Sequence, residues 1–155
     1  MASRIEGRLR ELGLELPQPH KPVANYRAWN IQSHRLHIAG QGPIRVDGTP
    51  IVGVVGVDLT SEEGKEAAAV VALNRIAQAK DALDGNLDRV NRWVKVGGMG
   101  NAQAEVTAQP EVINGASDLL GYVFGEAGRH AHAAIGMASL PIGISVAIDA
   151  VLEIV

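Results

Sequence analysis

The apolar residues at the start of the chain recur at the spacing of a short helix. Three of them fall on one helical face before Gly13, where the helix is expected to stop: Ile5, Leu9 and Leu12. Ser3 and Glu6 have the spacing of a capping box, in which each end of the motif satisfies a free amide of the first turn. We therefore expect residues 1–14 to form an N-terminal helical extension.

Short apolar runs separated by turn residues follow, which is typical of β-structure. The runs predict four strands, at 26–32, 35–39, 44–46 and 51–57. The last two flank Asp47-Gly48-Thr49-Pro50, whose Asp-Gly pair favours the positive backbone angles of a tight hairpin turn. The opening third of the chain is thus predicted to be a β-meander.

The clearest helical pattern begins after Thr60, which has the capping-box spacing with Glu63. Its apolar stripe repeats at three- and four-residue steps up to Gly85: Ala68, Val71, Ala72, Ile76, Ala79 and Leu83. A second helix is predicted from Pro110 to Phe124, because proline is well tolerated in the first helical turn.

The run from Arg89 to Val96 is rich in valine and tryptophan and predicts a strand, so strand, helix and strand are joined by a crossover. Two further strands are expected after the second helix. In the last, Gly143 to Val155, the even positions are all apolar, whereas the odd positions are small or half polar. The strand face that carries the odd-numbered residues is therefore expected neither to face solvent nor to be covered by a helix in the usual way.

These patterns predict an α+β domain with a six-stranded mixed sheet and two helices on one face. Two helices cannot cover both faces of such a sheet. We therefore expect the other face to meet a second subunit, because small residues suit close approach of two sheets. A homo-oligomer follows as a hypothesis.

Composition narrows the possible functions. The 155 residues fit a single domain spanning 1–155, and the absence of cysteine excludes thiolate nucleophiles, disulfides and cysteine-ligated zinc. A formal net charge of -3 and only five aromatic residues argue against a nucleic-acid partner. The charged N-terminus and the lack of a long apolar stretch predict no membrane association and a cytoplasmic location.

Local motifs predict little chemistry by themselves. His130-x-His132 would share one face of a strand, but without a third ligand motif we favour two partly exposed histidines over a metal site. The stretch from Gly97 to Asn101 lacks the lysine and hydroxyl of a phosphate loop and is interpreted as a turn. No metal and no cofactor are therefore expected.

Several segments together resemble the YjgF/RidA family of reactive intermediate deaminases. The matching pieces cover nearly the whole chain: Tyr26 ahead of Ala39-Gly40-Gln41-Gly42-Pro43, the pair Ile113-Asn114, and His132-x-x-Ile135-x-x-Ala138-x-Leu140-Pro141 before a final strand. The resemblance implies a chorismate-mutase-like fold and a homotrimer whose barrel is lined by the sheets. It also implies a small-molecule ligand in a cleft between subunits.

This sequence departs from the pattern of the family at two positions. Deaminating members carry an arginine eight residues before the Leu-Pro pair, and it holds the carboxylate of a 2-imino or 2-enamino acid. Here that position is His132, and nearby Arg129 is expected on the opposite strand face. The family's glutamate of the final strand corresponds to Ala147, with Asp149 two residues on and on the same face.

The resemblance places the ligand against five residues: Tyr26, Gly40, Asn114, His132 and Ala134. Tyr26 could offer its hydroxyl, and Gly40 exposes its backbone. The catalytic candidates are His132 and, in place of the glutamate, Asp149. Three roles stay open for His132: binding anions when protonated, acting as an acid or base, or lining a pocket whose activity is lost.

Three functions follow as hypotheses. The first is hydrolysis of an imine or enamine to a 2-oxo acid and ammonia. The second is a trimeric small-molecule binding or protective protein that uses the same cleft without hydrolysis. The third comes from labels carried by relatives, namely translation inhibition and endoribonuclease activity, against which acidity and scarce aromatic residues argue.

Overall fold

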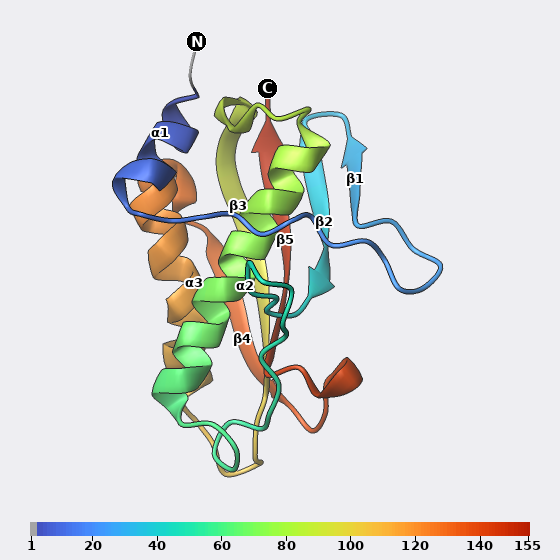
Figure 1. The fold of residues 1–155 in the computed structure, drawn as a ribbon, viewed down its shortest axis with the longest axis vertical. Helices are drawn as coiled ribbons and strands as arrows, with labels where there is room; N and C mark the ends of the chain where they lie inside the picture. The colour runs from blue at the N-terminus through green and yellow to red at the C-terminus, as the bar shows by residue number, and fades with distance from the viewer. Residues whose placement is uncertain (1–2) are drawn as a thin grey trace.

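Five strands form one mixed sheet, and the two long helices lie on the same face of it (Figure 1). In the computed structural model, which describes residues 3–155, the strand order is β1-β2-β5-β3-β4. Only β3 and β4 are parallel. The strands are β1 (Trp29–Gln32), β2 (Arg35–Gln41), β3 (Val90–Asn101), β4 (Ala131–Met137) and β5 (Val146–Ile154). The helices are α1 (Arg4–Glu11), α2 (Ser61–Ala82) and α3 (Gln109–Phe124), with short 3-10 turns η1 (Leu87–Arg89), η2 (Gly125–Gly128) and η3 (Pro141–Gly143).

The α+β class is as predicted, but the expected count of six strands is wrong. Residues 44–46 and 51–57 form isolated bridges instead of a hairpin ladder: Ile44 with Pro50, Val52 with Ile144, and Val55 with both Leu59 and Ala102. Each bridge has a different partner segment, and Pro50 has no amide hydrogen to donate. The turn itself forms, with Gly48 at a φ of 88°.

The N-terminal helix α1 is held against η1 by one carboxylate. Asp88 accepts hydrogen bonds from the amides of Arg4 (2.8 Å) and Ile5 (3.0 Å) and from the hydroxyl of Ser3 (2.9 Å). Ser3 also accepts from the amide of Glu6, as predicted, whereas the Glu6 carboxylate pairs with Lys80 of α2. Asp88 thus satisfies free amides of the first turn from outside the helix.

Helix α2 is buried on most of its circumference, between the sheet, α3 and the segment that follows α1 (Figure 1). Its start is fixed by the predicted capping box of Thr60 and Glu63. Alanine and glycine let α3 approach closely: a Cβ atom on Gly115 would stand 1.9 Å from the carbonyl oxygen of Lys65.

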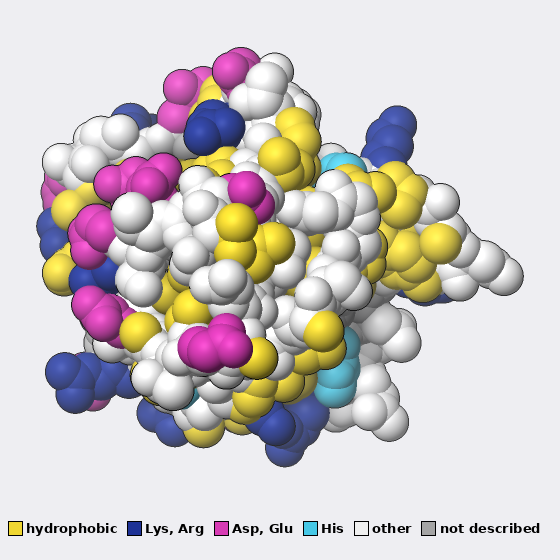
Figure 2. All heavy atoms as spheres, turned by 90° about the horizontal axis from the view of Figure 1, so that it is seen from below, with side chains coloured by type: hydrophobic (Ala, Val, Ile, Leu, Met, Phe, Trp, Pro, Cys, Tyr) yellow, Lys and Arg dark blue, Asp and Glu magenta, His cyan; other side chains and the backbone are white. Residues whose placement is uncertain are grey.

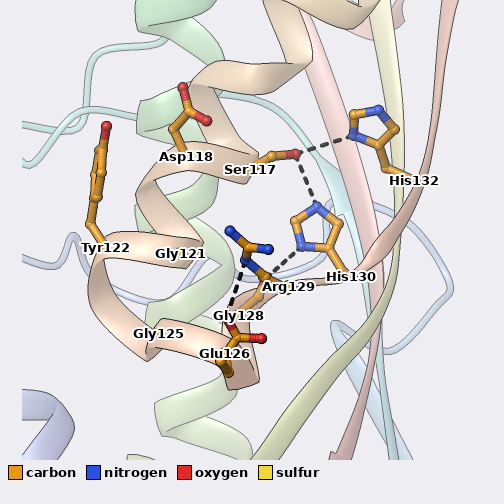
Figure 3. A pocket seen from close by; sticks show the side chains of 10 residues that line it. All are labelled: Ser117, Asp118, Gly121, Tyr122, Gly125, Glu126, Gly128, Arg129, His130 and His132. Carbon is orange, nitrogen blue, oxygen red and sulfur yellow. Dashed lines mark hydrogen bonds and ion pairs between the residues drawn. The ribbon is translucent and has the colours of Figure 1, made fainter.

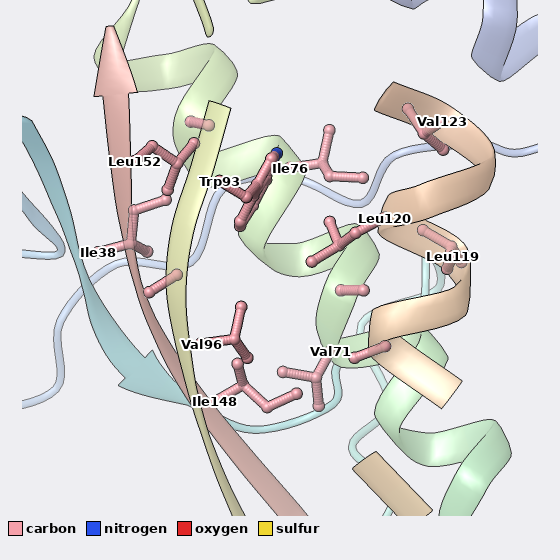
Figure 4. Packing of buried hydrophobic residues seen from close by; sticks show 14 of the residues in the cluster. Ile38, Val71, Ile76, Trp93, Val96, Leu119, Leu120, Val123, Ile148 and Leu152 are labelled. Atoms are coloured by element: carbon pink, nitrogen blue, oxygen red, sulfur yellow. The ribbon is translucent and has the colours of Figure 1, made fainter. Parts of the chain in front are cut away.

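Aliphatic side chains from the sheet fill the space beneath the two helices (Figure 4). Val96 and Ile148 of the sheet face Val71 and Ile76 of α2 in this layer. Each fully buried leucine or isoleucine contributes about 2 kcal/mol relative to an exposed one. The core is therefore built from many small contacts, as the composition suggests.

Strand β3 runs through the glycine stretch that the sequence indicated as a turn, so that interpretation is wrong. Gly97 pairs with Asp149, and Gly98 pairs with Ile148 of β5. A Cβ atom on Gly98 would stand 2.7 Å from the Ile113 side chain of α3. These glycines allow neighbouring side chains to lie directly on the strand.

The sheet face away from α2 and α3 (Figure 1) is called the open face below. It carries Asp149 and Val151 of β5, which alternate with buried residues along the strand. None of the helices in residues 3–155 covers it. Strand β4 pairs with β3 on one side only within the described chain, and its Ile135 is 51% exposed. An unpaired apolar edge of this kind is typical of a surface that another chain covers.

Tyr26 does not belong to β1, contrary to the predicted strand 26–32. It lies in the loop that projects beside β1 in Figure 1. The last ladder pair is Trp29 with Ile38, next to the point where the pairing of β2 with β5 shifts register. Beyond it the Ala28 carbonyl still accepts from the Ala39 amide at 2.9 Å, and Tyr26 lies outside the ladder.

Candidate functional site

Two histidines at the start of β4 converge on a serine of α3 (Figure 3). The Oγ atom of Ser117 is 2.9 Å from Nε2 of His130 and 3.2 Å from Nδ1 of His132. His130 also places Nδ1 at 2.7 Å from the carbonyl oxygen of Gly128. The His-x-His spacing correctly predicted a shared face, and that face is turned toward α3.

The Gly128 carbonyl fixes the direction of this hydrogen-bond chain. A carbonyl oxygen can only accept, so Nδ1 of His130 carries a proton, and Nε2 of the neutral ring accepts from the Ser117 hydroxyl. The Ser117 oxygen then accepts the Nδ1 hydrogen of His132. In neutral His132 this leaves Nε2 without a proton.

Burial favours the neutral form of His130. It lowers the pKa of His130 below the ordinary value for histidine. The hydrogen bond to the Gly128 carbonyl opposes this effect, and the neighbouring charge of His132 adds to it. The neutral tautomer assigned to His130 is thus the form that its surroundings stabilise.

The histidines and Ser117 line an open hollow of about 790 Å³ between α3, η2 and β4. Asp118 and Tyr122 of α3 also line it, as does Arg129, whose Nε lies 3.5 Å from Glu126 Oε1. Arg129 was expected to face away from His132. It lies instead beside the same hollow, next to Glu126 of η2.

Two predicted ligand-binding residues lie near this hollow. Ala134 follows His132 by two residues and shares its strand face. Asn114 precedes Ser117 by three residues on α3, so the two side chains share one face of the helix.

The other three predicted residues lie elsewhere. Gly40 and Asp149 meet on the open face, where a Cβ atom on Gly40 would stand 3.8 Å from Asp149 Cβ. Tyr26, 41% exposed, lies in the projecting loop. In one chain, therefore, His132 and Asp149 lie on opposite faces of the sheet and are not brought together.

The chain matches the model of a family described as "YjgF/chorismate_mutase-like, putative endoribonuclease" over residues 6–151. The chain belongs to the YjgF/RidA family. The resemblance drawn from the Gly-Gln and Leu-Pro motifs is thereby confirmed, and the fold matches the chorismate-mutase-like expectation.

The YjgF/RidA chain has relatives along almost its whole length. It is 42% identical to Protein TCP17 of Trypanosoma cruzi over 99% of this chain and 96% of that one. It superimposes on a solved protein of unknown function from Agrobacterium tumefaciens with a TM-score of 0.89 at 45% identity, covering 97% and 94% of the two chains. A "putative endoribonuclease" from Shewanella oneidensis gives 0.92 at 34% identity, covering 97% and 99%.

No sequence motif pointed to Arg75, a buried arginine of this YjgF/RidA chain. Arg75 of α2 is 1% exposed and donates to the Ala39 carbonyl and, at 2.6 Å, to Gln41 Oε1. Burial lowers its pKa to about 10, against the opposing influence of Tyr26 and Asp149. One signal was present: Arg75 lies four residues after Val71 and so interrupts the apolar stripe.

The part of the chain that the structure describes has neither a cluster of metal ligands nor a membrane-spanning helix. Among residues 3–155 no three histidine or acidic side chains are grouped as metal ligands would be. No helix there is long and apolar enough to cross a membrane. On the face shown in Figure 2, basic and acidic side chains are interspersed and form no continuous basic surface.

Proposed function

We propose that this chain is a hydrolase of small imines and enamines, forming a carbonyl compound and ammonia. The observation that carries the proposal is the orientation of His132 by Ser117, which leaves Nε2 of neutral His132 without a hydrogen, on a residue that lines an open hollow. An imidazole held in one tautomer by a second hydrogen bond is a suitable acid and base near neutral pH.

The reaction needs one water and one mobile proton. With the substrate nitrogen protonated as an iminium, Nε2 of His132 takes one proton from the water whose oxygen adds to the carbon of the C=N bond, which gives a neutral carbinolamine. His132 then returns that proton to the nitrogen. As the C–N bond breaks, Nε2 takes the hydroxyl proton, the carbonyl forms, and the leaving ammonia takes the proton from His132. Ser117 accepts the Nδ1 hydrogen throughout and stabilises the imidazolium that forms transiently.

A second part of the proposal concerns the other half of the site. Asp149 and Gly40 lie on the open face, whereas His132 lies on the helix side, so one chain cannot supply both groups to one ligand. We infer that a second copy completes the site, in a homotrimer with a cleft at each subunit boundary. The exposed edge strand β4 and the uncovered open face support this assembly.

Activity is tested by generating 2-aminoacrylate in the assay and following release of the 2-oxo acid. The native protein is expected to exceed the spontaneous rate, and His132→Gln to lose most of that excess, because glutamine cannot act as a base. His132→Arg restores the family's usual residue and provides a second chance for activity. The proposal fails if the native protein does not exceed the spontaneous rate, and activity in His132→Arg alone would show that the reaction needs the arginine.

The shared site is tested by mixing two inactive variants. His132→Gln and Asp149→Asn, unfolded together and refolded, should recover activity, because some boundaries then combine an intact His132 with an intact Asp149 from different chains. Refolding each variant alone provides the control. Light scattering should give three times the 16.3 kDa of one chain, and a 16 kDa monomer at micromolar concentration would exclude the shared site.

A binding protein without hydrolysis is the alternative favoured by two replacements, His132 for the family's arginine and Ala147 for its glutamate. In that case metabolites raise the melting temperature of the native protein while none is turned over. A metabolite screen without any stabilising compound at millimolar concentration would exclude it.

Endoribonuclease activity is favoured only by the description of the family and of the Shewanella relative as endoribonucleases. Two neighbouring histidines could in principle share acid and base roles on a ribose phosphate. Incubation of RNA with the native protein and with His132→Gln, both free of contaminating nuclease, decides it. Cleavage that survives in the variant would come from another source.

A further inference from the structure

Neutral His132 offers a ligand a lone pair at Nε2 and no hydrogen. Its only ring hydrogen is directed at Ser117 Oγ, 3.2 Å from Nδ1, because the Ser117 hydroxyl is itself directed at His130. An arginine at this position would offer several hydrogens and a fixed positive charge. The group facing the ligand has therefore changed from a donor to an acceptor.

The charged side chains around the hollow also disfavour a carboxylate ligand. Its one lining cation, Arg129, lies beside the Glu126 carboxylate, at 3.5 Å. Asp118 adds a further carboxylate and takes part in no ion pair within the described residues. With both histidines neutral, the lining carries one net negative charge, which disfavours a carboxylate and favours a cation.

We propose that a hydrogen-bond-donating nitrogen group, such as an iminium, amine or amidinium, binds at Nε2 of His132, beside the hollow that this residue lines, where arginine-bearing relatives hold a carboxylate. Ser117 and His130 are then positioning residues that determine this preference. The identification of that group as the reacting nitrogen rests on the proposed function, whereas the binding preference itself does not.

The orientation suits the proposed reaction. A nitrogen seated at Nε2 of His132 lies where the imidazole can return the proton that the leaving ammonia requires. A carboxylate seated there would keep the C=N bond away from the base. A 2-imino acid would therefore lie along β4 in the opposite direction from that in the arginine-bearing relatives, with its nitrogen and not its carboxylate at His132.

Acetamidinium and acetate provide a matched pair of probes, because they have the same shape and opposite charge and neither reacts. The native protein, labelled with ¹⁵N in its histidines, is titrated with each probe at about pH 8, where free imidazole is neutral. We expect acetamidinium to shift the His132 signals and to bind at least about tenfold more tightly than acetate. The ¹⁵N shifts should also report a protonated Nδ1 and an unprotonated Nε2 for His132.

Ser117→Ala removes the acceptor that holds the Nδ1 hydrogen, so His132 is free to adopt the other tautomer. The preference for acetamidinium should fall to within about threefold, while Ser61→Ala, at the start of α2, should keep the native preference. Circular dichroism checks that both variants fold, and the native titration alone decides the matter if they do not.

Three results would overturn the inference: a protonated Nε2 in native His132, acetate binding as tightly as acetamidinium, or acetate binding that Arg129→Gln abolishes. None of them depends on turnover. Failure of the 2-aminoacrylate assay alone would remove the proposed function and leave this binding preference intact.

Discussion

Asp149 of β5 lies directly against Gly97 of β3, its partner in the antiparallel ladder. A Cβ atom on Gly97 would stand 2.2 Å from Asp149 Oδ1, which is far inside any permitted contact. The missing side chain at Gly97 therefore gives the carboxylate its position on the open face, next to Gly40. A glycine in one strand thus determines where a candidate catalytic group of the neighbouring strand can lie.

Gly97→Ala should displace the Asp149 carboxylate and lower imine hydrolysis by at least about tenfold, if Asp149 acts as proposed. The extra methyl group should also reduce the free energy of unfolding by about 1–3 kcal/mol. Gly100→Ala is the matched control in the same strand, because its Cβ atom would have 3.9 Å to the nearest atom, the Ile135 carbonyl oxygen. Rates and urea unfolding of both variants check the prediction, and equal activity in the two would contradict it.

The same glycine shows where the sequence misleads. Gly97 to Asn101 was interpreted as a turn because glycine usually marks loops, yet these residues continue β3. Their neighbours, Asp149 across the sheet and Ile113 on the helix side, are more than ten residues away in the chain. Local propensity contains no information about such close approaches. Helices with complete caps are predicted better, because the residues of a capping box are neighbours in the sequence.

The crossing of α2 and α3 offers a sharper test of packing. Gly115→Ala should cost about 3 kcal/mol or more in the free energy of unfolding, because its Cβ atom would stand 1.9 Å from the Lys65 carbonyl oxygen and backbone must move. Gly121, on the same helix, has nothing within 4 Å of its Cβ position. Gly121→Ala should instead stabilise by about 0.5–1 kcal/mol, because alanine favours helix. Urea unfolding that ranks the two in the reverse order would show that the helices do not cross here.

Asp88 should control the docking of α1. Asp88→Ala removes the acceptor of the Arg4 and Ile5 amides, so the first turn loses its cap. We expect a loss of about 1 kcal/mol in the free energy of unfolding and faster amide exchange confined to α1. Glu105→Ala, at an exposed acidic residue in the loop before α3, is the control, and hydrogen exchange measured residue by residue is the readout. Unchanged exchange in α1 after Asp88→Ala would contradict the assigned contact.

His130 should make the folded state sensitive to mild acid. Burial, with the charge of His132, lowers its folded pKa, although the Gly128 bond opposes this. The unfolded chain therefore takes up the proton at higher pH than the folded one. The resulting stabilisation is complete above the ordinary histidine pKa of about 6.5 and is lost as pH falls through the folded value.

Melting temperatures of the native protein should therefore fall between about pH 8 and pH 5.5, and His130→Asn should reduce that fall. Asparagine keeps a donor for the Gly128 carbonyl and does not titrate. His37→Asn, at an exposed position of β2, is the matched control. Equal pH dependence in the native protein and His130→Asn would show that another group is responsible.

The candidate site was only partly predictable. The His-x-His spacing and the Leu-Pro motif indicate His132, because both are local patterns, at the start of β4 and directly after it. Ser117 has no distinguishing neighbours in the sequence and becomes interesting only when α3 brings it to 3.2 Å from Nδ1 of His132. The separation of His132 from Asp149 also follows from pairing, since it depends on which face of each strand turns toward the helices.

Arg75 should be essential for the bulge in β2 that exposes Gly40. Its guanidinium donates to the Ala39 carbonyl and the Gln41 side chain, where β2 shifts register. Arg75→Met keeps the apolar stem but leaves both acceptors unpaired, so we expect a loss of about 2–4 kcal/mol in the free energy of unfolding. Arg75→Lys keeps the charge and can replace one donor only, so an intermediate loss is expected. Urea unfolding gives the order, and amide exchange at Ala39 to Gln41 locates the effect. Equal stability of Arg75→Met and the native protein would mean that the bulge forms without the guanidinium.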